Sequence, residues 1–359
     1  MTESHVDPDA TVESIGEFGL IDRLARIVTG PEGDPLRPAA TGAIGIGDDA
    51  ALWHPDPEAN EVLTTDALVE GVHFRLATTS WRELGWKALA ENISDIAAMG
   101  AVPTRAFVTL GVPGGTRVAD LDELYHGMAD LQAHLLDDGG YDPAIVGGDV
   151  VSSPVLFLSI TLMGELHGLG LRRAAGRPGD LLAVTGALGG SAGGLALLEA
   201  ASEVPDSPDA RTLIALHRGP EPRVSEGISL AEAGIYCGMD LSDGLLGDCG
   251  RLAYASGLAA TIQADLLPLP PALVRQFPDE AVALALRGGE DYELLVAGPA
   301  DRIEEASRLL AERQLMPLTV VGRLSEGPPG VVNVVDAQGQ PIDVAGGSWD
   351  HFRTRQDRA

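Results

Sequence analysis

The chain of 359 residues lacks the features that assign many proteins to a class at sight. Its two cysteines, Cys237 and Cys249, form no C-x-x-C pair, which argues against a structural zinc site and a disulfide framework. It has no run of about 18 apolar residues that would span a membrane, and its first residues lack the basic and apolar regions of a signal peptide. These absences predict a soluble, cytoplasmic protein.

Positive charge is scarce as well. Lys87 is the only lysine, and 24 Lys and Arg face 53 Asp and Glu, giving a formal net charge of −29. Such a balance argues against binding to nucleic acid or to anionic membranes, because both need basic patches. The acidity has two explanations that the sequence leaves open, which are adaptation to high salt and a compositional bias toward Ala, Gly, Asp and Arg.

Two common nucleotide-binding signatures are absent too. The chain has no G-x-x-x-x-G-K-[ST] loop, and it has no kinase glycine loop followed by V-A-I-K and H-R-D. The glycine-rich stretch "TGALGGSAGG" (185–194) has no lysine after it. Its small residues suit either close packing of a helix on a sheet or direct phosphate binding, and the first reading is favoured.

What is present predicts two domains, because the chain is long and 45% hydrophobic. Strands alternate with helices, which is typical of α/β or α+β folds. Strands are expected at 42–53 and 60–69, and a helix over 80–100 that starts with a Ser80–Glu83 capping box and ends at Gly100. The expected organisation is a disordered tail at 1–12, an N-terminal domain at 13–166 and a C-terminal domain at 167–359. The turn-rich basic segment "HGLGLRRAAGRPGD" marks the boundary.

Carboxylates recur at the ends of apolar strands or in glycine turns, where α/β scaffolds present functional groups. They are Asp48, Asp49, Asp66, Asp149, Asp240, Asp243, Glu290 and Asp291, joined by Asp95 on the helix. Each alone fits a plain structural role: Asp243 would cap the helix that begins at Leu245, and Asp95 would pair with Lys87. Converging, they would repel one another unless cations intervened, and hard oxygen donors select Mg²⁺, Mn²⁺ or Ca²⁺.

Several divalent cations indicate phosphoryl transfer, in which Mg²⁺ lets an acidic protein hold a polyphosphate. Arg172, Arg173 and Arg177 would supply further positive charge to a phosphate, or would simply form a solvated cluster in a linker.

Eight motifs in order carry a family resemblance: "GIGDDAAL", "TTDALVEGVHF", "KALAENISDIAAMGAVP", "IVGGDV", "RPGDLLAVTGALGGSAGGL", "MDLSDGLLGD", "LRGGEDYELL" and "SWDHF". Together they resemble the thiamine-monophosphate kinase family. That family belongs to the ATP-binding superfamily of aminoimidazole ribonucleotide synthetase and selenophosphate synthetase. The resemblance implies two α/β domains of α+β type and a homodimer built through the N-terminal sheets. It also implies Mg²⁺-dependent transfer of the ATP γ-phosphate to thiamine monophosphate.

The resemblance also implies roles for individual residues, with no general base assigned and with Asp240 and Asp243 the most critical. Mg²⁺ ligands would be Asp49, Thr64, Thr65, Asp66, Asp95, Asp149, Asp240 and Asp243. ATP contacts would be Tyr125, Gly148, Asp149, Arg173 and Ser242. Substrate contacts would be His73, Glu290 and Trp349, since an indole and a carboxylate suit a cationic ligand. Asp48 would support Asp49, and Arg172 remains an alternative to Arg173.

Two other hypotheses stay open. One is a different ATP-dependent reaction of the superfamily, such as that of aminoimidazole ribonucleotide synthetase. A selenophosphate synthetase is disfavoured because no cysteine precedes Cys237. The other is a non-catalytic nucleotide-binding homologue, against which the retained carboxylate set argues.

Overall fold

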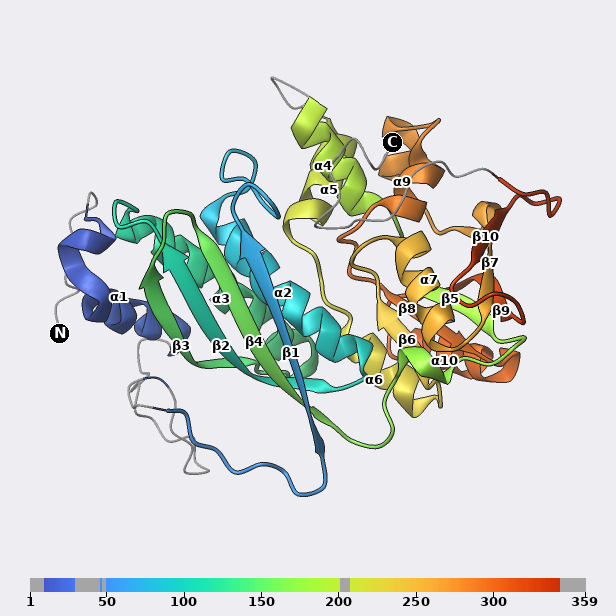
Figure 1. Ribbon diagram of the computed structural model, residues 1–359, viewed down its shortest axis with the longest axis horizontal. Coiled ribbons are helices and arrows are strands. Elements are labelled where there is room, and N and C mark those ends of the chain that lie inside the picture. The colour runs from blue at the N-terminus through green and yellow to red at the C-terminus, as the bar shows by residue number, and fades with distance from the viewer. Residues whose placement is uncertain (1–9, 30–45, 47–49, 201–206, 343–359) are drawn as a thin grey trace. The chain divides into compact units, whose positions relative to one another are not determined.

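The computed structural model describes residues 10–29, 46, 50–200 and 207–342, and Figure 1 draws them as a coloured ribbon. The chain divides into two compact units. Unit 1 is Met1–Ile96 with Val102–Glu165, and unit 2 is Ala97–Ala101 with Leu166–Ala359. None of the helices in the described ranges is both long enough and apolar enough to cross a membrane.

Unit 1 is built on a four-stranded mixed sheet in the order β1-β4-β2-β3. Its elements are α1 (Val12–Thr29), β1 (Asn60–Val69), α2 (Trp81–Ala98), β2 (Val102–Val112), α3 (Val118–Gly139), β3 (Ala144–Ser152) and β4 (Phe157–Leu166). Strand β2 is parallel to β3 and antiparallel to β4. Figure 1 shows α2 and α3 behind one face of this sheet. Residues along β4 are alternately buried and half-buried, as expected when one face of a strand packs on a helical layer.

The start of α2 confirms the predicted capping box. Glu83 Oε2 accepts from the Ser80 backbone N–H at 2.8 Å, and the Glu83 N–H donates to Ser80 Oγ at 3.3 Å. Gly100, with φ +70°, follows the end of the helix, where a left-handed residue ends helical hydrogen bonding. The predicted strand at 60–69 is confirmed as β1, whereas most of the one at 42–53 lies outside the described residues.

Unit 2 is built on a six-stranded sheet in the order β10-β7-β9-β5-β8-β6, in which only the β10–β7 pair among the described strands is parallel. Its strands are β5 (Leu181–Thr185), β6 (Cys237–Asp240), β7 (Ala259–Gln263), β8 (Leu294–Gly298), β9 (Leu318–Ser325) and β10 (Val332–Val335). Its helices are α4 (Gly190–Ala200), α5 (Pro208–Arg218), α6 (Val224–Glu232), α7 (Leu245–Ala255), α8 (Pro271–Gln276), α9 (Ala281–Arg287) and α10 (Ala300–Glu312), with short 3-10 turns η1 (Arg173–Ala175) and η2 (Ala264–Leu266). Both units thus join helices to a mixed sheet, which confirms the predicted fold class.

The glycine-rich stretch 185–194 serves helix packing within unit 2. A Cβ added at Gly194 would lie 2.2 Å from the Leu213 carbonyl oxygen of α5. No side chain fits there without moving the neighbouring backbone. The small residues thus serve close packing, as predicted, but at this position the partner is helix α5 and not a sheet.

Candidate functional site

In unit 1 a polar group forms between β1 and α2. Alternate residues of a strand share a face, so Thr64 and Asp66 both project toward α2. Thr64 Oγ1 donates to Asp95 Oδ2 at 2.5 Å, and the Asp66 backbone N–H donates to Asn92 Oδ1 at 3.2 Å. Three of the predicted metal ligands therefore lie together, with Asn92 as a partner that the motif reading did not assign.

The two carboxyl groups of this cluster influence each other. Protein atoms displace water around the Asp66 carboxyl, and the negative charge of Asp95 and a hydrogen bond to it act in the same direction. Together they raise the pKa of Asp66 to about 6. Close carboxylates that resist ionising together are the arrangement that a hard divalent cation relieves. The donor set of Thr64, Asp66 and Asp95 thus fits Mg²⁺.

Other predicted residues of unit 1 lie away from this cluster. Thr65 projects from the opposite face of β1, where its hydroxyl accepts from Thr161 Oγ1 of β4 at 3.2 Å. Asp149 is exposed on β3, and β1 and β3 are at opposite edges of the sheet, three strand spacings or about 14 Å apart. The sheet therefore places Asp149 at a second position rather than beside Asp66.

The predicted nucleotide and substrate residues of unit 1 occupy different environments. Gly148 precedes Asp149, and an added Cβ would lie 2.0 Å from the Val108 backbone oxygen, so only glycine fits there. Tyr125 is buried on α3, and burial raises the pKa of its hydroxyl well above the usual range. His73 is half-buried in the turn after β1, where its Nδ1 accepts from the Val69 backbone N–H at 3.0 Å.

In unit 2 the second acidic group follows strand β6. Asp240, the last residue of the strand, is only 3% exposed. Asp243 comes three residues later and pairs with Arg251, with 2.6 Å between its Oδ2 and a guanidinium nitrogen. Helix α7 begins with Gly244 as its N-cap and no side-chain cap, so Asp243 does not cap it. The alternative structural role for Asp243 is therefore wrong.

Asp248 fixes the geometry around Asp243. Its buried carboxylate accepts from the Asp243 backbone N–H at 3.0 Å and from Arg251 at 2.5 Å. Burial raises the pKa of Asp248 to about 6, although Arg251 opposes the shift. Asp248 lies inside "MDLSDGLLGD", but the motif predicts no role for it, because a supporting contact five residues away leaves no pattern of its own.

The loop at 288–293 lies directly against the loop that follows β6. The Glu290 backbone N–H donates to the Ser242 backbone carbonyl oxygen at 2.8 Å. The Tyr292 backbone N–H donates to the Leu241 carbonyl oxygen at 3.0 Å. Glu290 and Tyr292 adopt left-handed backbone angles, φ +66° and +49°. Such angles persist in non-glycine residues only where the surroundings enforce them, and they cluster at functional sites. The fold thus brings Ser242 and Glu290 together.

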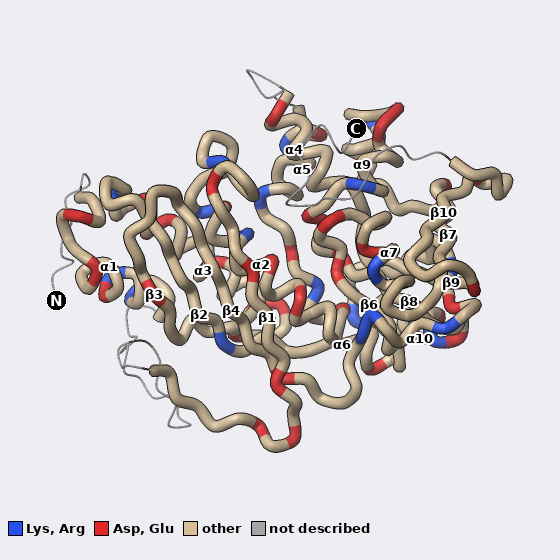
Figure 2. Tube along the Cα trace, in the orientation of Figure 1, with Lys and Arg blue, Asp and Glu red and all other residues tan. Residues whose placement is uncertain are grey.

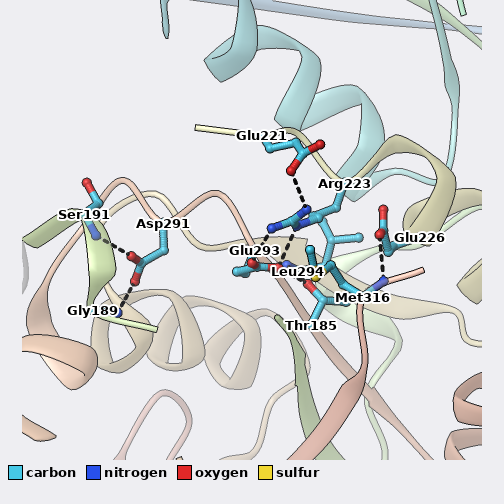
Figure 3. Close-up of polar contacts among 10 residues, drawn as sticks. All are labelled: Thr185, Gly189, Ser191, Glu221, Arg223, Glu226, Asp291, Glu293, Leu294 and Met316. Carbon is cyan, nitrogen blue, oxygen red and sulfur yellow. Dashed lines mark hydrogen bonds and ion pairs between the residues drawn. The ribbon is translucent and has the colours of Figure 1, made fainter. Parts of the chain in front are cut away.

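Two buried carboxylates anchor this loop, and they point in opposite directions in Figure 3. Asp291 accepts from the backbone N–H groups of Gly189 at 2.6 Å and Ser191 at 3.1 Å, at the start of α4. Burial raises the pKa of Asp291 to about 7 against the effect of these two bonds. Because Asp291 already uses these amides, direct phosphate binding by the glycine-rich stretch is disfavoured on geometry as well.

Glu293 holds the other end of the loop. It accepts two bonds from Arg223, at 2.9 and 2.7 Å, and one from Thr185 Oγ1 at 2.6 Å (Figure 3). Sequence reasoning missed Arg223, which precedes α6 and lies 70 residues from its partner. Its only local signal is an arginine between a proline-rich turn and a helix.

The arginines of the 172–177 segment are exposed, so both Arg172 and Arg173 remain available to a ligand. The Arg173 backbone is fixed, because its carbonyl oxygen accepts from Ser256 Oγ at 2.8 Å. Figure 2 shows acidic residues spread through both units. Asp48, Asp49 and Trp349 lie outside the described residues.

Comparison with known proteins gives consistent matches along the chain. Residues 47–166 match the AIR synthase related protein N-terminal domain, and residues 177–335 match the C-terminal domain. Thiamine-monophosphate kinase of Escherichia coli is 37% identical, over 94% of this chain and 99% of that protein. Thiamine-monophosphate kinase from Stenotrophomonas maltophilia has a crystal structure with a TM-score of 0.76 and 35% identity, over 91% of this chain and 98% of that one.

A further solved structure, AaThiL complexed with AMPPCP and TMP, has a TM-score of 0.70 and 29% identity, over 96% of this chain and 99% of that chain. The matches run through both units, each of which also has the fold class that the motifs implied. The chain therefore belongs to the thiamine-monophosphate kinase family, with both AIR synthase related domains present.

Proposed function

We propose that the protein transfers the γ-phosphate of ATP to thiamine monophosphate, giving thiamine diphosphate and ADP. The observation that carries the proposal is similarity over nearly the full length of a thiamine-monophosphate kinase, at 37% identity. A related protein of known structure is complexed with an ATP analogue and TMP. The two acidic groups, one in each unit, supply the oxygen donors that such a reaction needs.

Mg²⁺ is the proposed cofactor. Its ligands would come from Asp49, Thr64, Asp66, Asp95, Asp149, Asp240 and Asp243, whereas Thr65 projects from the other face of β1 and is withdrawn from the predicted set. When bound, Mg²⁺ would neutralise charge on the phosphates of both substrates. The raised pKa of Asp66 and the buried end of β6 at Asp240 support this part of the proposal.

No residue needs to act as a strong general base. The attacking atom is a phosphate oxygen of thiamine monophosphate, which is already ionised near neutral pH. The protein therefore contributes in-line positioning and charge stabilisation. ATP would be held by Tyr125, Gly148, Asp149, Arg173 and Ser242, with the Arg173 backbone fixed by Ser256.

Substrate recognition is assigned to His73, Glu290 and Trp349. Thiamine monophosphate carries a cationic thiazolium ring, which pairs with the Glu290 carboxylate and stacks on an indole. Glu290 is suited to this role because its backbone is fixed while its side chain is 26% exposed.

A homodimer and a cytoplasmic location complete the proposal. Leu63 of β1 is 64% exposed, and the residues of β4 that face away from the helices are half-buried. A second copy would cover this face, and light scattering of the purified protein measures its mass directly.

The decisive experiment incubates the protein with ATP, Mg²⁺ and thiamine monophosphate and follows thiamine diphosphate and ADP by chromatography. Equal amounts of the two products are expected, and EDTA should abolish both. Omitting thiamine monophosphate controls for ATP hydrolysis. Phosphorylation of a different acceptor, with none of thiamine monophosphate, would reject the proposal while leaving the fold assignment intact.

A further inference from the structure

A buried histidine, His217, lies beside the carboxylate of Glu290. His217 lies on α5 and is 6% exposed, and its Nδ1 is 3.4 Å from Glu290 Oε2. The same nitrogen is 3.0 Å from the hydroxyl oxygen of Ser191, which is 1% exposed on α4. The Glu290 side chain is 26% exposed, so its carboxylate has one protein-facing side and one open side.

The chemistry of these groups fixes which of them carries the proton. An ionised carboxylate only accepts hydrogen bonds, so a ring nitrogen facing it must present an N–H. A proton on Nδ1 of His217 would face both Glu290 Oε2 at 3.4 Å and the nearer Ser191 hydroxyl oxygen at 3.0 Å. An imidazole N–H beside a carboxylate attracts it, so His217 favours the orientation in which the Glu290 carboxylate faces Nδ1.

The main chain around the carboxylate is held independently of His217. Glu290 donates its N–H to Ser242 at 2.8 Å and has φ +66°. The next residue, Asp291, accepts from the Ser191 N–H at 3.1 Å, as Figure 3 shows. With the backbone fixed, the contacts of the Glu290 side chain determine where its carboxylate points, and His217 provides one of these contacts.

We propose that His217, supported by Ser191, is a positioning residue that aims the Glu290 carboxylate at the cationic rings of thiamine monophosphate. The inference rests on the proposed function, in which Glu290 contacts the substrate. It assigns a role in substrate recognition to two buried residues on α4 and α5, which do not reach the ligand themselves.

The test compares His217→Leu, His217→Asn and Ser191→Ala in the full chain. Calorimetry gives the Kd of thiamine monophosphate alone, and kinetics give KM for each substrate. Loss of the charge-assisted bond in His217→Leu is expected to raise the Kd and KM for thiamine monophosphate about tenfold, with KM for ATP within about twofold. His217→Asn places an amide N–H where Nδ1 was, so it should stay within about threefold of wild type.

Two further variants separate positioning from general damage. His126 of α3 also lies beside a glutamate, Glu123, at 3.9 Å, but it is in unit 1 and its side chain is 45% exposed. His126→Leu should leave every constant unchanged. A double variant, His217→Leu with Glu290→Gln, should bind thiamine monophosphate no more weakly than Glu290→Gln alone, because His217 acts through Glu290.

The outcomes divide cleanly. The inference is overturned if His217→Leu leaves the Kd for thiamine monophosphate unchanged, if both KM values rise together, or if the effects multiply in the double variant. Should His217→Leu fold poorly, Ser191→Ala tests the same role, because it removes the hydroxyl partner of Nδ1 and is expected to raise the Kd for thiamine monophosphate with KM for ATP unchanged; an unchanged Kd would overturn the inference. If Glu290→Gln binds thiamine monophosphate as tightly as wild type, the substrate role of Glu290 is wrong and the His217 role with it, while product formation still tests the kinase reaction separately.

Discussion

The ion pair between Arg223 and Glu293 offers a sharp test of what holds the 288–293 loop. The side chains are 12% and 4% exposed, and the guanidinium meets the carboxylate with two parallel bonds. Burial would lower the pKa of Arg223, but Glu293 overrides that effect and raises it. Arg223→Met would leave the Glu293 charge buried without this partner.

The expected cost follows from that geometry. Removing one partner of a buried, doubly hydrogen-bonded pair destabilises a protein by about 3–5 kcal/mol, because the remaining charge stays desolvated. For a unit of this size, that loss lowers the melting temperature by about 10 °C. Replacing both residues, Arg223→Met with Glu293→Leu, removes the buried charge as well and should recover most of the loss.

Differential scanning calorimetry measures the transition of each variant. Arg275→Met is the matched control, because Arg275 pairs with Asp209 at 2.7 Å while its side chain is 62% exposed. An exposed pair contributes roughly 0–1 kcal/mol, so this variant should melt within a few degrees of wild type. If the melting temperature of Arg223→Met also lies within a few degrees of wild type, the ion pair is not what holds the loop.

Three further predictions follow from other parts of the structure. Asp240→Asn and Asp243→Asn should each reduce thiamine diphosphate formation roughly a hundredfold or more with unchanged circular dichroism, and near-normal turnover in both would contradict their metal role. Because the folded-state pKa of Asp291 is raised to about 7, the folded protein binds an extra proton from about pH 4 to 7 and loses stability as pH rises through that window. Asp291→Asn should flatten this slope in urea unfolding, and an unaltered slope would argue against the shift. Gly148→Ala places a methyl group 2.0 Å from a backbone oxygen and should cost about 1–3 kcal/mol or more, whereas Gly115→Ala, with nothing within 4 Å, should be nearly neutral in thermal melts.

Local signals in the sequence carried much of the fold. The capping box at Ser80 and the glycine at position 100 predicted both ends of α2, because helix ends are determined by residues within a few positions. Strand β1 was likewise readable from its β-branched run between turns. The order of strands in each sheet could not be predicted from the sequence, since it depends on pairings between distant segments.

In the candidate site, too, local motifs predicted some residues, whereas contacts between distant segments could not be predicted. The motifs identified Thr64, Asp66 and Asp95, which the fold brings together. The two-residue period of a strand places Thr65 on the opposite face from Thr64 and Asp66, which the shared motif "TTDALVEGVHF" does not indicate. The bonds from Arg223 to Glu293 and from His217 to Ser191 join residues 70 and 26 positions apart, and no local pattern encodes them.

The way Asp291 ends the glycine-rich turn has a consequence for how this protein handles anions. The backbone amides at the start of a helix are one kind of place where a protein can attract a polyphosphate. Here the carboxyl group of Asp291 already accepts from two of these amides, those of Gly189 and Ser191. An incoming phosphate would therefore have to displace Asp291 to reach the start of α4. The exposed arginines at 172–177 give unit 2 a different place at which a negatively charged ligand can be met.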